Sequence, residues 1–323
     1  MPVVRLDAVP ANRPPVGLWR SAGRRMLRNR MAAAGLVYVA FLALLALFAP
    51  LVAPHNPIAG DLRTAGAYRQ AAWVDDPNPL YAGTWDHPLG TDAIGRDVLS
   101  RVIFGTRVSL VVGFVPLAVV LAIAVPVGLA AGYGPRWLDD ALMRLTDAVY
   151  AFPALLFFVV AQVSFADTAF GELLGGLVLL FVTLSVVNWT GLARLVRGET
   201  LARRRSDYVL AARATGGGSA RIVARHILPN VAGTIVVAAA FTVPGAIVAE
   251  AVLSYLGIGL RPDVSLDAPF PTSWGRMILD GSSAWQAQPW VLIAPCLALA
   301  STTLAFTFVG DGLRDAFDPR GAP

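Results

Sequence analysis

Six long apolar runs dominate the chain, and polar stretches of very unequal length separate them. An α-helix rises about 1.5 Å per residue, so about 20 apolar residues cross the roughly 30 Å hydrocarbon core of a bilayer. The runs long enough to do this are residues 32–52, 108–131, 142–163, 173–195, 231–253 and 290–309. The pattern therefore predicts an all-α integral membrane protein with six transmembrane helices.

Prolines interrupt the second and third of these runs. Pro116 and Pro126 lie in the second, and Pro153 lies in the third. Proline removes one backbone hydrogen bond and bends a helix, which a membrane helix tolerates where its neighbours satisfy the freed carbonyl. We expect both spans to be kinked, either because the protein moves or because packing requires the bend.

The arginines are distributed unequally between the two sets of connecting segments. Nineteen of the 26 precede the first run, follow the last, or lie between runs two and three or four and five, counting Arg144 and Arg194 at the adjoining ends of runs three and four. Basic residues accumulate on the cytoplasmic side of membrane proteins, so both termini are predicted to be cytoplasmic. This divides the chain into a cytoplasmic tail (1–31), a first span with a long extracytoplasmic loop (32–107), a membrane domain (108–312) and a second cytoplasmic tail (313–323).

Composition agrees with a membrane protein. The chain is 56% hydrophobic and 15% charged, with a mean hydropathy of +0.62, whereas soluble domains carry about 25% charged residues. The pI is near 9.9, but the arginines are dispersed beside apolar runs, which favours membrane topology over nucleic-acid binding. The single cysteine, Cys296, excludes an intrachain disulfide or a cysteine-built metal site.

The polar stretch 203–229, on the predicted cytoplasmic side, has the pattern of a short helix, a sharp turn and a second helix. Tyr208, Ala211, Ala212 and Thr215 share one face of the first helix. Three glycines at 216–218 end it, because glycine adopts the left-handed turn that other residues avoid. Ser219 is placed to cap the second helix, which is expected to end at Pro229. Such a unit is suited to docking against a partner.

The amino-acid sequence of this stretch resembles that of a known family. Ala211-Ala212-x-x-x-Gly216 followed by Pro229 is similar to the EAA loop of ABC importer permeases, through which the membrane subunit contacts its cytoplasmic ATPase. Residues 189–194 and 225–229, with His87–Asp92, Gly95–Arg101 and Ser273–Gly275, resemble the C-type permease of dipeptide, oligopeptide and nickel importers. The resemblance extends from about residue 32 to 320, without the N-terminal tail and residues 60–81.

This resemblance implies the type I ABC importer permease fold in a bacterial inner membrane, with 108–312 as its permease domain. It also implies a second, B-type permease, one or two ABC ATPase subunits and an extracytoplasmic solute-binding protein. ATP and Mg²⁺ would be bound by the partner ATPases, with no cofactor or metal in this chain. The cargo stays open among dipeptides, oligopeptides, nickel and other solutes.

The same resemblance implies which residues of the loop act in coupling. They are Asp207, Ala211, Ala212, Arg213, Gly216, Arg225, His226 and Pro229. The sequence departs from the family at Leu210, where a glutamate is usual, and Asp207 is placed about one turn earlier to supply a carboxylate. The sequence also looks longer than the family pattern at 261–271, which predicts a local insertion.

Residues 90–97, GTDAIGRD, have the glycine spacing of a phosphate-binding loop but not its chemistry. The required lysine is Arg96 and the required hydroxyl is Asp97. The chain contains no lysine at all, so a normal P-loop is excluded and any ATP-driven step needs a separate polypeptide.

Few ionisable residues remain as candidates for chemistry. Glu250, in the fifth run, is a candidate for the outer gate or substrate path, or else an interfacial hydrogen-bond partner. His55 and His87 lie in the outer loop and are expected to be solvated, while His226 lies inside, so the three cannot form one metal site. The charged group at 139–147 either contacts the ATPase or is neutralised locally.

The sequence leaves one rival function class, an ATPase-independent secondary transporter or channel. It would explain six kinked spans but not loop 203–229, and it would require paired charges within the membrane. No spacing typical of a catalytic triad is present, so we expect a non-catalytic membrane subunit.

Overall fold

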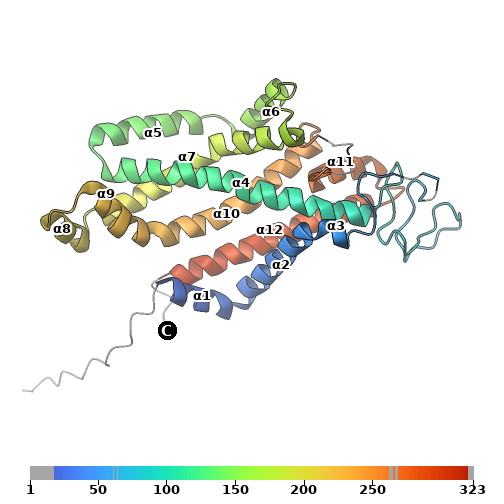
Figure 1. Cartoon of the computed structure of the whole chain (residues 1–323), viewed down its shortest axis with the longest axis horizontal. Helices are drawn as coiled ribbons and strands as arrows, with labels where there is room; N and C mark the ends of the chain where they lie inside the picture. Colours follow the sequence, from blue (N-terminus) through green and yellow to red (C-terminus); the bar gives the residue numbers. More distant parts are fainter. Residues whose placement is uncertain (1–17, 61, 64, 262–264, 266–267, 319–323) are drawn as a thin grey trace, which may run out of the picture.

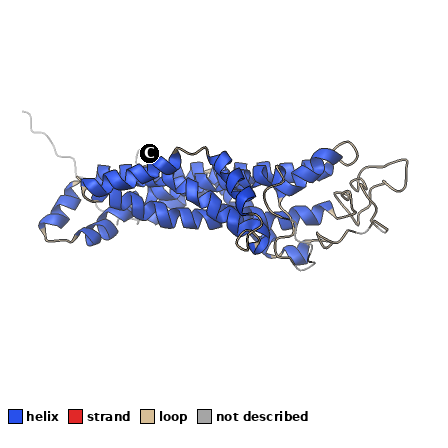
Figure 2. Cartoon of the chain, turned by 90° about the horizontal axis from the view of Figure 1, so that it is seen from above, coloured by secondary structure: helices blue, strands red, loops and turns tan. Residues whose placement is uncertain are grey.

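The computed structural model describes residues 18–60, 62–63, 65–261, 265 and 268–318, and these form an elongated bundle of helices (Figures 1 and 2). No strand occurs among them; the extended segments make only isolated bridges. Five helical segments are long and apolar enough to cross a membrane: Arg30–Leu47, Val98–Tyr133, Leu173–Arg203, Ser219–Tyr255 and Trp290–Phe317. A sixth span exists if the bent pair Arg136–Tyr150 and Ala154–Phe165 is counted as one. The prediction of an all-α membrane protein is confirmed.

The helices follow one another with one long interruption. In order they are α1 (Leu18–Arg28), α2 (Arg30–Leu47), α3 (Ala49–Val52), α4 (Val98–Tyr133), α5 (Arg136–Tyr150), α6 (Ala154–Phe165), the 3-10 turn η1 (Leu173–Gly176), α7 (Leu177–Arg203), α8 (Asp207–Ala214), α9 (Ser219–Ile222), the π-helical turn η2 (Val223–Ile227), α10 (Leu228–Tyr255), α11 (Trp274–Ala284) and α12 (Trp290–Phe317). The segment between α3 and α4 is the long loop predicted from the sequence, here called the outer loop (53–97).

The third apolar run is not one continuous helix. α5 and α6 meet at an angle of 75° across residues 151–153. Pro153 has no N–H to donate and disfavours helical geometry at the residue before it. The kink at Pro153 is confirmed, but the prediction of a single helix over 142–163 is wrong. By contrast, α4 continues through Pro116 and Pro126 as one helix.

α4 begins ten residues earlier than the hydrophobic run suggested, at Val98 rather than 108. Asp97 caps it, because its Oδ2 accepts hydrogen bonds of 2.7 Å from both the N–H and the Oγ of Ser100. The expectation of an irregular loop up to 107 is therefore wrong for its last ten residues. The polar side chains of these residues lie inside the protein and not in lipid, so hydropathy alone does not detect that residues 98–107 are helical.

Small residues bring α4 close to its neighbours α7 and α10. A Cβ on Gly128 would lie 2.6 Å from the Cβ of Val196 on α7, and one on Gly113 would lie 2.8 Å from Val243 on α10. Membrane helices pack by such close approach because lipid tails give them no hydrophobic force to associate. α4 is consequently the central helix of the bundle, with α7 on one side and α10 and α12 on the other (Figure 1).

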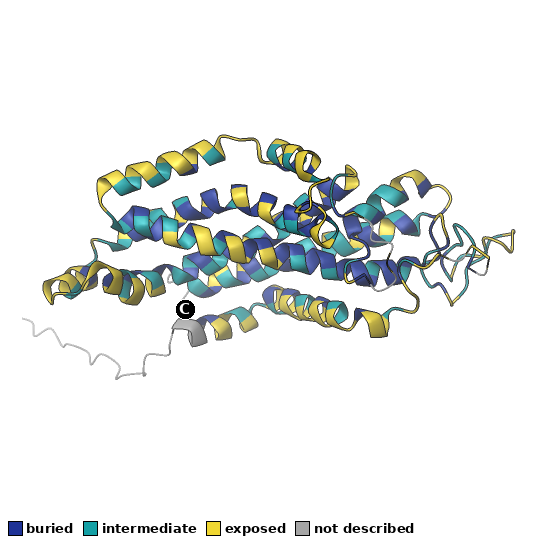
Figure 3. Ribbon diagram, turned by 45° about the horizontal axis from the view of Figure 1, so that its top comes forward, coloured by how far each residue is buried: buried dark blue, intermediate teal, exposed yellow. Residues whose placement is uncertain are grey.

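The two ends of the bundle differ in structure. α8, α9, α1 and the last turns of α12 lie at one end, and α3, the outer loop and α11 lie at the other (Figure 1). Arg25 on α1 donates a hydrogen bond of 3.4 Å to the backbone oxygen of Asp318, which joins the two chain termini at the α8 end. Exposed residues concentrate on the outward faces of α2, α5 and α8 (Figure 3).

Candidate functional site

The polar stretch singled out in the sequence folds as α8, a tight turn, α9 and the start of α10. α8 carries Asp207 in its first turn, where a carboxylate interacts favourably with the positive end of the helix dipole. Tyr208, Leu210 and Ala211 are exposed, whereas Val209 is 0% exposed. α8 therefore presents one bare face to its surroundings and holds to the bundle by the other.

The turn after α8 is a Schellman motif, which explains two of the three glycines. The Gly217 N–H donates to Ala212 O and the Gly216 N–H donates to Arg213 O, each at 3.0 Å. Gly216 has φ +80, and a Cβ on Gly217 would lie 2.6 Å from Ala212 O. Gly218 meets neither constraint, because a Cβ there would lie in open space. Of the three glycines expected to end the helix, only Gly216 and Gly217 are therefore required by the geometry of the turn.

The second helical segment differs from the expectation in two ways. Gly218, not Ser219, is at the N-cap position, and no side chain caps α9. The helix does not end at Pro229 either: α9 continues through the π-helical turn η2 into α10, where Pro229 lies in the first turn. Pro229 comes just after the π-helical turn, whose wider hydrogen-bond pattern accommodates a residue that has no N–H to donate. Loop 203–229 is therefore continuous with the long helix α10.

One apolar cluster anchors the loop to three long helices. Val209 of α8, Ile222 of α9 and Ile227 of η2 are each at most 1% exposed. They pack with Ala193 and Val196 of α7, Ala124 and Leu129 of α4, and Val231 of α10, among others. One densely packed apolar cluster therefore joins α8 to all three long helices.

The remaining loop residues named from the sequence lie at different depths. Asp207, Ala211 and Arg225 are exposed, His226 is half-buried, and Ala212 packs against the apolar cluster. Arg213 donates a hydrogen bond of 3.1 Å to the hydroxyl of Tyr133 at the end of α4 and lies over its ring. The 212 side chain therefore faces inward, while the 211 side chain belongs to the bare face.

The acidic group on α5 is neutralised by arginines of α7. Asp139 accepts hydrogen bonds of 2.5 and 2.7 Å from Arg197, and Asp147 pairs with Arg194 at 3.1 Å. Asp140 lies 3.9 Å from Arg136 in an exposed i,i+4 pair. The carboxylates thus hold α5 against α7, as the local-neutralisation hypothesis requires, although most partners come from another helix.

Glu250 is buried at the other end of the bundle, with 1% exposure. Ser254 Oγ donates a hydrogen bond of 2.6 Å to its Oε1, and Ser273, which caps α11, lies beside the same carboxyl group. Ser254 Oγ in turn accepts from the Leu260 N–H at 3.2 Å. Glu250 therefore links the end of α10 to the start of α11, and the geometry fits a hydrogen-bond partner more closely than a path-lining group.

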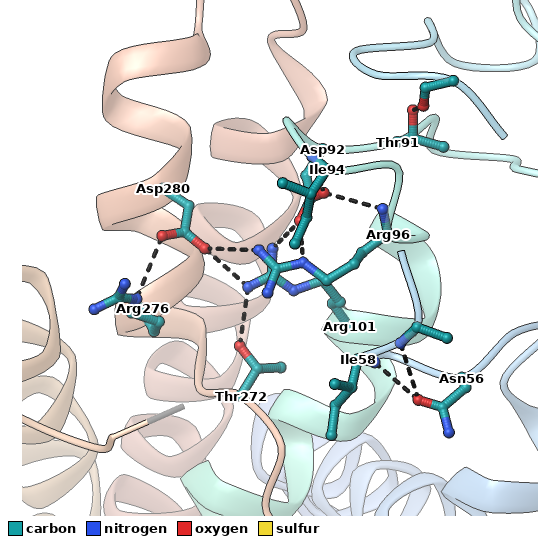
Figure 4. Close-up of polar contacts among 12 residues, drawn as sticks. Asn56, Ile58, Thr91, Asp92, Ile94, Arg96, Arg101, Thr272, Arg276 and Asp280 are labelled. Carbon is teal, nitrogen blue, oxygen red and sulfur yellow. Dashed lines mark hydrogen bonds and ion pairs between the residues drawn. The ribbon is translucent and has the colours of Figure 1, made fainter. Parts of the chain in front are cut away.

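A buried ion-pair network beside Glu250 was not found from the sequence. Arg101 of α4, 1% exposed, donates to Asp92 of the outer loop at 2.6 Å and to Asp280 of α11 at 2.9 Å (Figure 4). Arg96 and Arg276 pair with the same carboxylates. The one feature of the sequence that could have indicated it is Arg101, a charged residue shortly before the apolar run 108–131. The network holds the outer loop, α4 and α11 together.

The outer histidines are brought together by the fold. The rings of His55 and His87 stack with centroids 4.4 Å apart, and His87 Nδ1 lies 2.9 Å from Asp97 Oδ1. His87 is 7% exposed, so the expectation that it is solvated is wrong. His226 lies at the α8 end, as the sequence indicated.

An open cavity of about 420 Å³ lies between α6, α7 and α10, midway along the bundle. Its lining includes Asn188 and Gly191 of α7, and Thr242 and Gly245 of α10, in an otherwise apolar wall. Polar groups and bare backbone in an apolar membrane helix face usually meet protein or a ligand path, since lipid leaves them unsatisfied.

Comparison with known proteins identifies the family. Residues 124–322 match the family described as binding-protein-dependent transport system inner membrane component. The chain belongs to this family. Residues 17–71 match the N-terminal TM domain of oligopeptide transport permease C, so the expectation that the tail and residues 60–81 lack counterparts is wrong for 17–31 and 60–71.

Curated relatives agree with membership in this permease family over almost the whole chain. The oligopeptide transport system permease protein OppC of Haemophilus influenzae is 36% identical, covering 94% of this chain and 89% of that protein. The dipeptide transport system permease protein DppC of Bacillus subtilis is also 36% identical, covering 97% and 89%. The glutathione transport system permease protein GsiD of Pectobacterium atrosepticum is 35% identical, covering 99% and 95%. The resemblance to C-type peptide permeases is confirmed.

A solved structure agrees with the fold. A chain of the inward-facing MetNI methionine ABC transporter superposes with a TM-score of 0.51, covering 68% of this chain and 96% of that chain at 19% identity. The fold is that of an ABC importer permease. The predicted insertion at 261–271 includes residues 262–264 and 266–267, which lie outside the described residues.

Proposed function

We propose that the chain is the permease subunit of an ATP-driven importer of di- or oligopeptides in a bacterial inner membrane, with both termini and loop 203–229 in the cytoplasm. Family membership and the names of the relatives support the transport class. The arginine asymmetry supports the orientation. A non-catalytic role follows, with ATP and Mg²⁺ bound by partner subunits.

The observation that carries the coupling proposal is the two-sided packing of α8. Its exposed side, with Tyr208, Leu210 and Ala211, is available to a partner, while Val209 on the opposite side is fixed in the cluster shared with α4, α7 and α10. Movement of a docked ATPase is then transmitted to the long helices and not absorbed by a flexible loop. Leu210 replaces the usual glutamate with apolar contact area, and Asp207 supplies the nearby carboxylate.

The cavity between α7 and α10 supports the proposal that the translocation path runs along this side of the bundle. It is open on one side, and its wall carries Asn188, Thr242 and two glycines. A second, B-type permease facing this wall would close it into a path between two subunits. An extracytoplasmic solute-binding protein would deliver cargo at the α11 end, and the cargo is selected there as well as along the path.

The test is purification of the chain from its native membrane in mild detergent, with identification of accompanying proteins and their ATPase activity. The proposal predicts a second permease and a Walker-motif ATPase in the eluate. An exposed-face variant, Ala211→Arg, should lose the ATPase while retaining the second permease. Arg136→Ala, which removes an exposed side chain on α5, is the matched control and should retain both.

The rival secondary-transporter function makes the opposite prediction. It requires undiminished transport by the chain alone in liposomes, with no ATPase recovered. Within the described residues, the buried Arg101 of α4 is used in a link between helices, through its ion pair with Asp280 of α11. That arrangement favours the ATP-driven importer.

A further inference from the structure

We propose that His55, His87 and Asp97 form a binding site for a divalent first-row metal ion such as Zn²⁺, at the α11 end of the bundle. One ligand atom from each residue lies within 4.8 Å of the others. Imidazole nitrogen and carboxylate oxygen are ligands that Zn²⁺ takes in proteins. The residues come from three parts of the outer loop: its start just after α3, its interior, and its last residue, which caps α4.

Two of the three ligands are already near the required spacing. Bonds of about 2.0–2.1 Å in a tetrahedral site separate neighbouring ligand atoms by about 3.3 Å. His87 Nδ1 and Asp97 Oδ1 are 2.9 Å apart and share one proton. An ion that replaces this proton moves the two side chains by a few tenths of an ångström. Only His55 has to approach, and its side chain is exposed and therefore free to do so.

Further hydrogen bonds, made by Ser100, orient the ligands, as groups around the direct ligands do in known metal sites. The Asp97 Oδ2 accepts from the N–H and the Oγ of Ser100, each at 2.7 Å, which leaves Oδ1 directed to His87. The Ser100 Oγ also accepts from the backbone N–H of His55 at 3.0 Å. One serine thus positions both the carboxylate and the backbone that carries the exposed histidine.

The site also has an entry path. His55 is part of the wall of an open cavity of about 570 Å³, together with Asn56, Phe104 and Arg107. Three protein ligands leave the fourth position of a tetrahedral ion for water from this cavity. A bound ion would join the chain after α3 to the outer loop and the start of α4, and would therefore stabilise the folded outer end.

The test uses the purified full chain in its native complex, stripped with a chelator and titrated with Co²⁺ and Zn²⁺. Co²⁺ gives visible absorption bands whose intensity reports its coordination, and calorimetry gives the Zn²⁺ affinity and stoichiometry. The decisive variant is His55→Ala, because an exposed side chain can be removed without unfolding the protein. His226→Ala, at the opposite end, is the matched control.

The proposal predicts one Zn²⁺ per chain, an affinity at least tenfold weaker in His55→Ala, and no change in His226→Ala. His55→Cys should retain the ion and add a sulfur-to-Co²⁺ charge-transfer band. The only native cysteine, Cys296, is in α12 and far along the chain. Equal Zn²⁺ affinity in the wild type and His55→Ala would overturn the proposal, as would a stripped complex that binds no ion. His87 and Asp97 would then only cap α4.

Discussion

Arg101 on α4 donates a hydrogen bond of 2.9 Å to Asp280 on α11, and both side chains belong to a network that also holds Asp92 of the outer loop. α4 and α11 are far apart in the sequence, so they are held together by contacts between side chains, and this ion pair is a principal polar one. Arg101 is 1% exposed and Asp92 is 2% exposed. Asp92 is therefore buried beside two arginines, Arg101 and Arg96, and loses one of these partners when Arg101 is replaced.

Arg101→Ala is predicted to destabilise the protein by about 1–3 kcal/mol, because it removes a charged hydrogen bond from the buried Asp92, which keeps only Arg96 as an arginine partner. Thermal unfolding in detergent, followed by fluorescence-detected size exclusion, measures the loss. Replacing Arg101 with Met and Asp92 with Asn together should restore much of it. A single Arg101→Ala variant as stable as the wild type would show that the network contributes nothing to the fold.

Gly216→Val is predicted to strain the turn after α8 by about 1–3 kcal/mol, because Gly216 has φ +80 and a β-branched residue disfavours that region. Gly216→Asn should be tolerated, since asparagine adopts the left-handed conformation more readily. Gly218→Ala is a neutral control, because a Cβ there lies in open space. ATP hydrolysis and uptake should become uncoupled in the valine variant alone. Normal coupling in that variant would contradict the proposed role of the turn.

Val209→Ala is predicted to weaken the anchor of α8 by about 1–3 kcal/mol, because Val209 is fully buried in the apolar cluster. The expected result is ATPase activity with reduced uptake per ATP hydrolysed. Leu210→Ala changes an exposed neighbour on the same helix and should instead affect binding of the ATPase. Uptake per ATP, measured in proteoliposomes, distinguishes the two. If both variants show the wild-type uptake per ATP hydrolysed, the packing of α8 against the cluster does not transmit movement of the ATPase to the long helices.

Glu250→Ala is predicted to lower both complex abundance and uptake, because it leaves the buried hydroxyl of Ser254 without its acceptor. Glu250→Gln keeps an acceptor oxygen and should retain both. Abundance in the membrane and uptake are measured together for each variant. Loss of uptake at normal abundance in the glutamine variant would support the gate hypothesis and not the link between α10 and α11.

The long apolar runs and the glycine turn are the parts of the structure that the sequence predicts well, because each depends on local chemistry. Hydrophobic length determines whether a helix spans a bilayer, and φ +80 at Gly216 strongly favours glycine. The bend between α5 and α6 was predicted only as a kink at Pro153, since the size of a bend depends on packing. The continuous helix through Pro229 was missed because η2 adjusts the turn before the proline.

The sequence could not reveal contacts between distant segments. Arg101 and Asp280 are 179 residues apart, and His55 and Asp97 meet only when the outer loop folds back on α4. Val209 and Leu210 are adjacent and both apolar, so the pattern of a short helix does not show which one is buried. That distinction, on which the coupling proposal rests, comes from the position of α8 against α7 and α10.

Site-specific cross-linking from α8 tests the central claim most directly. Replacing Cys296 by Ser and introducing a cysteine at position 211 gives one reactive group on the exposed face of α8. The account predicts that, in native membranes, a short bifunctional reagent joins this cysteine to the ATPase subunit, and that one at position 136 on α5 is not joined. Cross-links from position 136 alone, or none from position 211 in transport-active membranes, would contradict docking of the ATPase on α8.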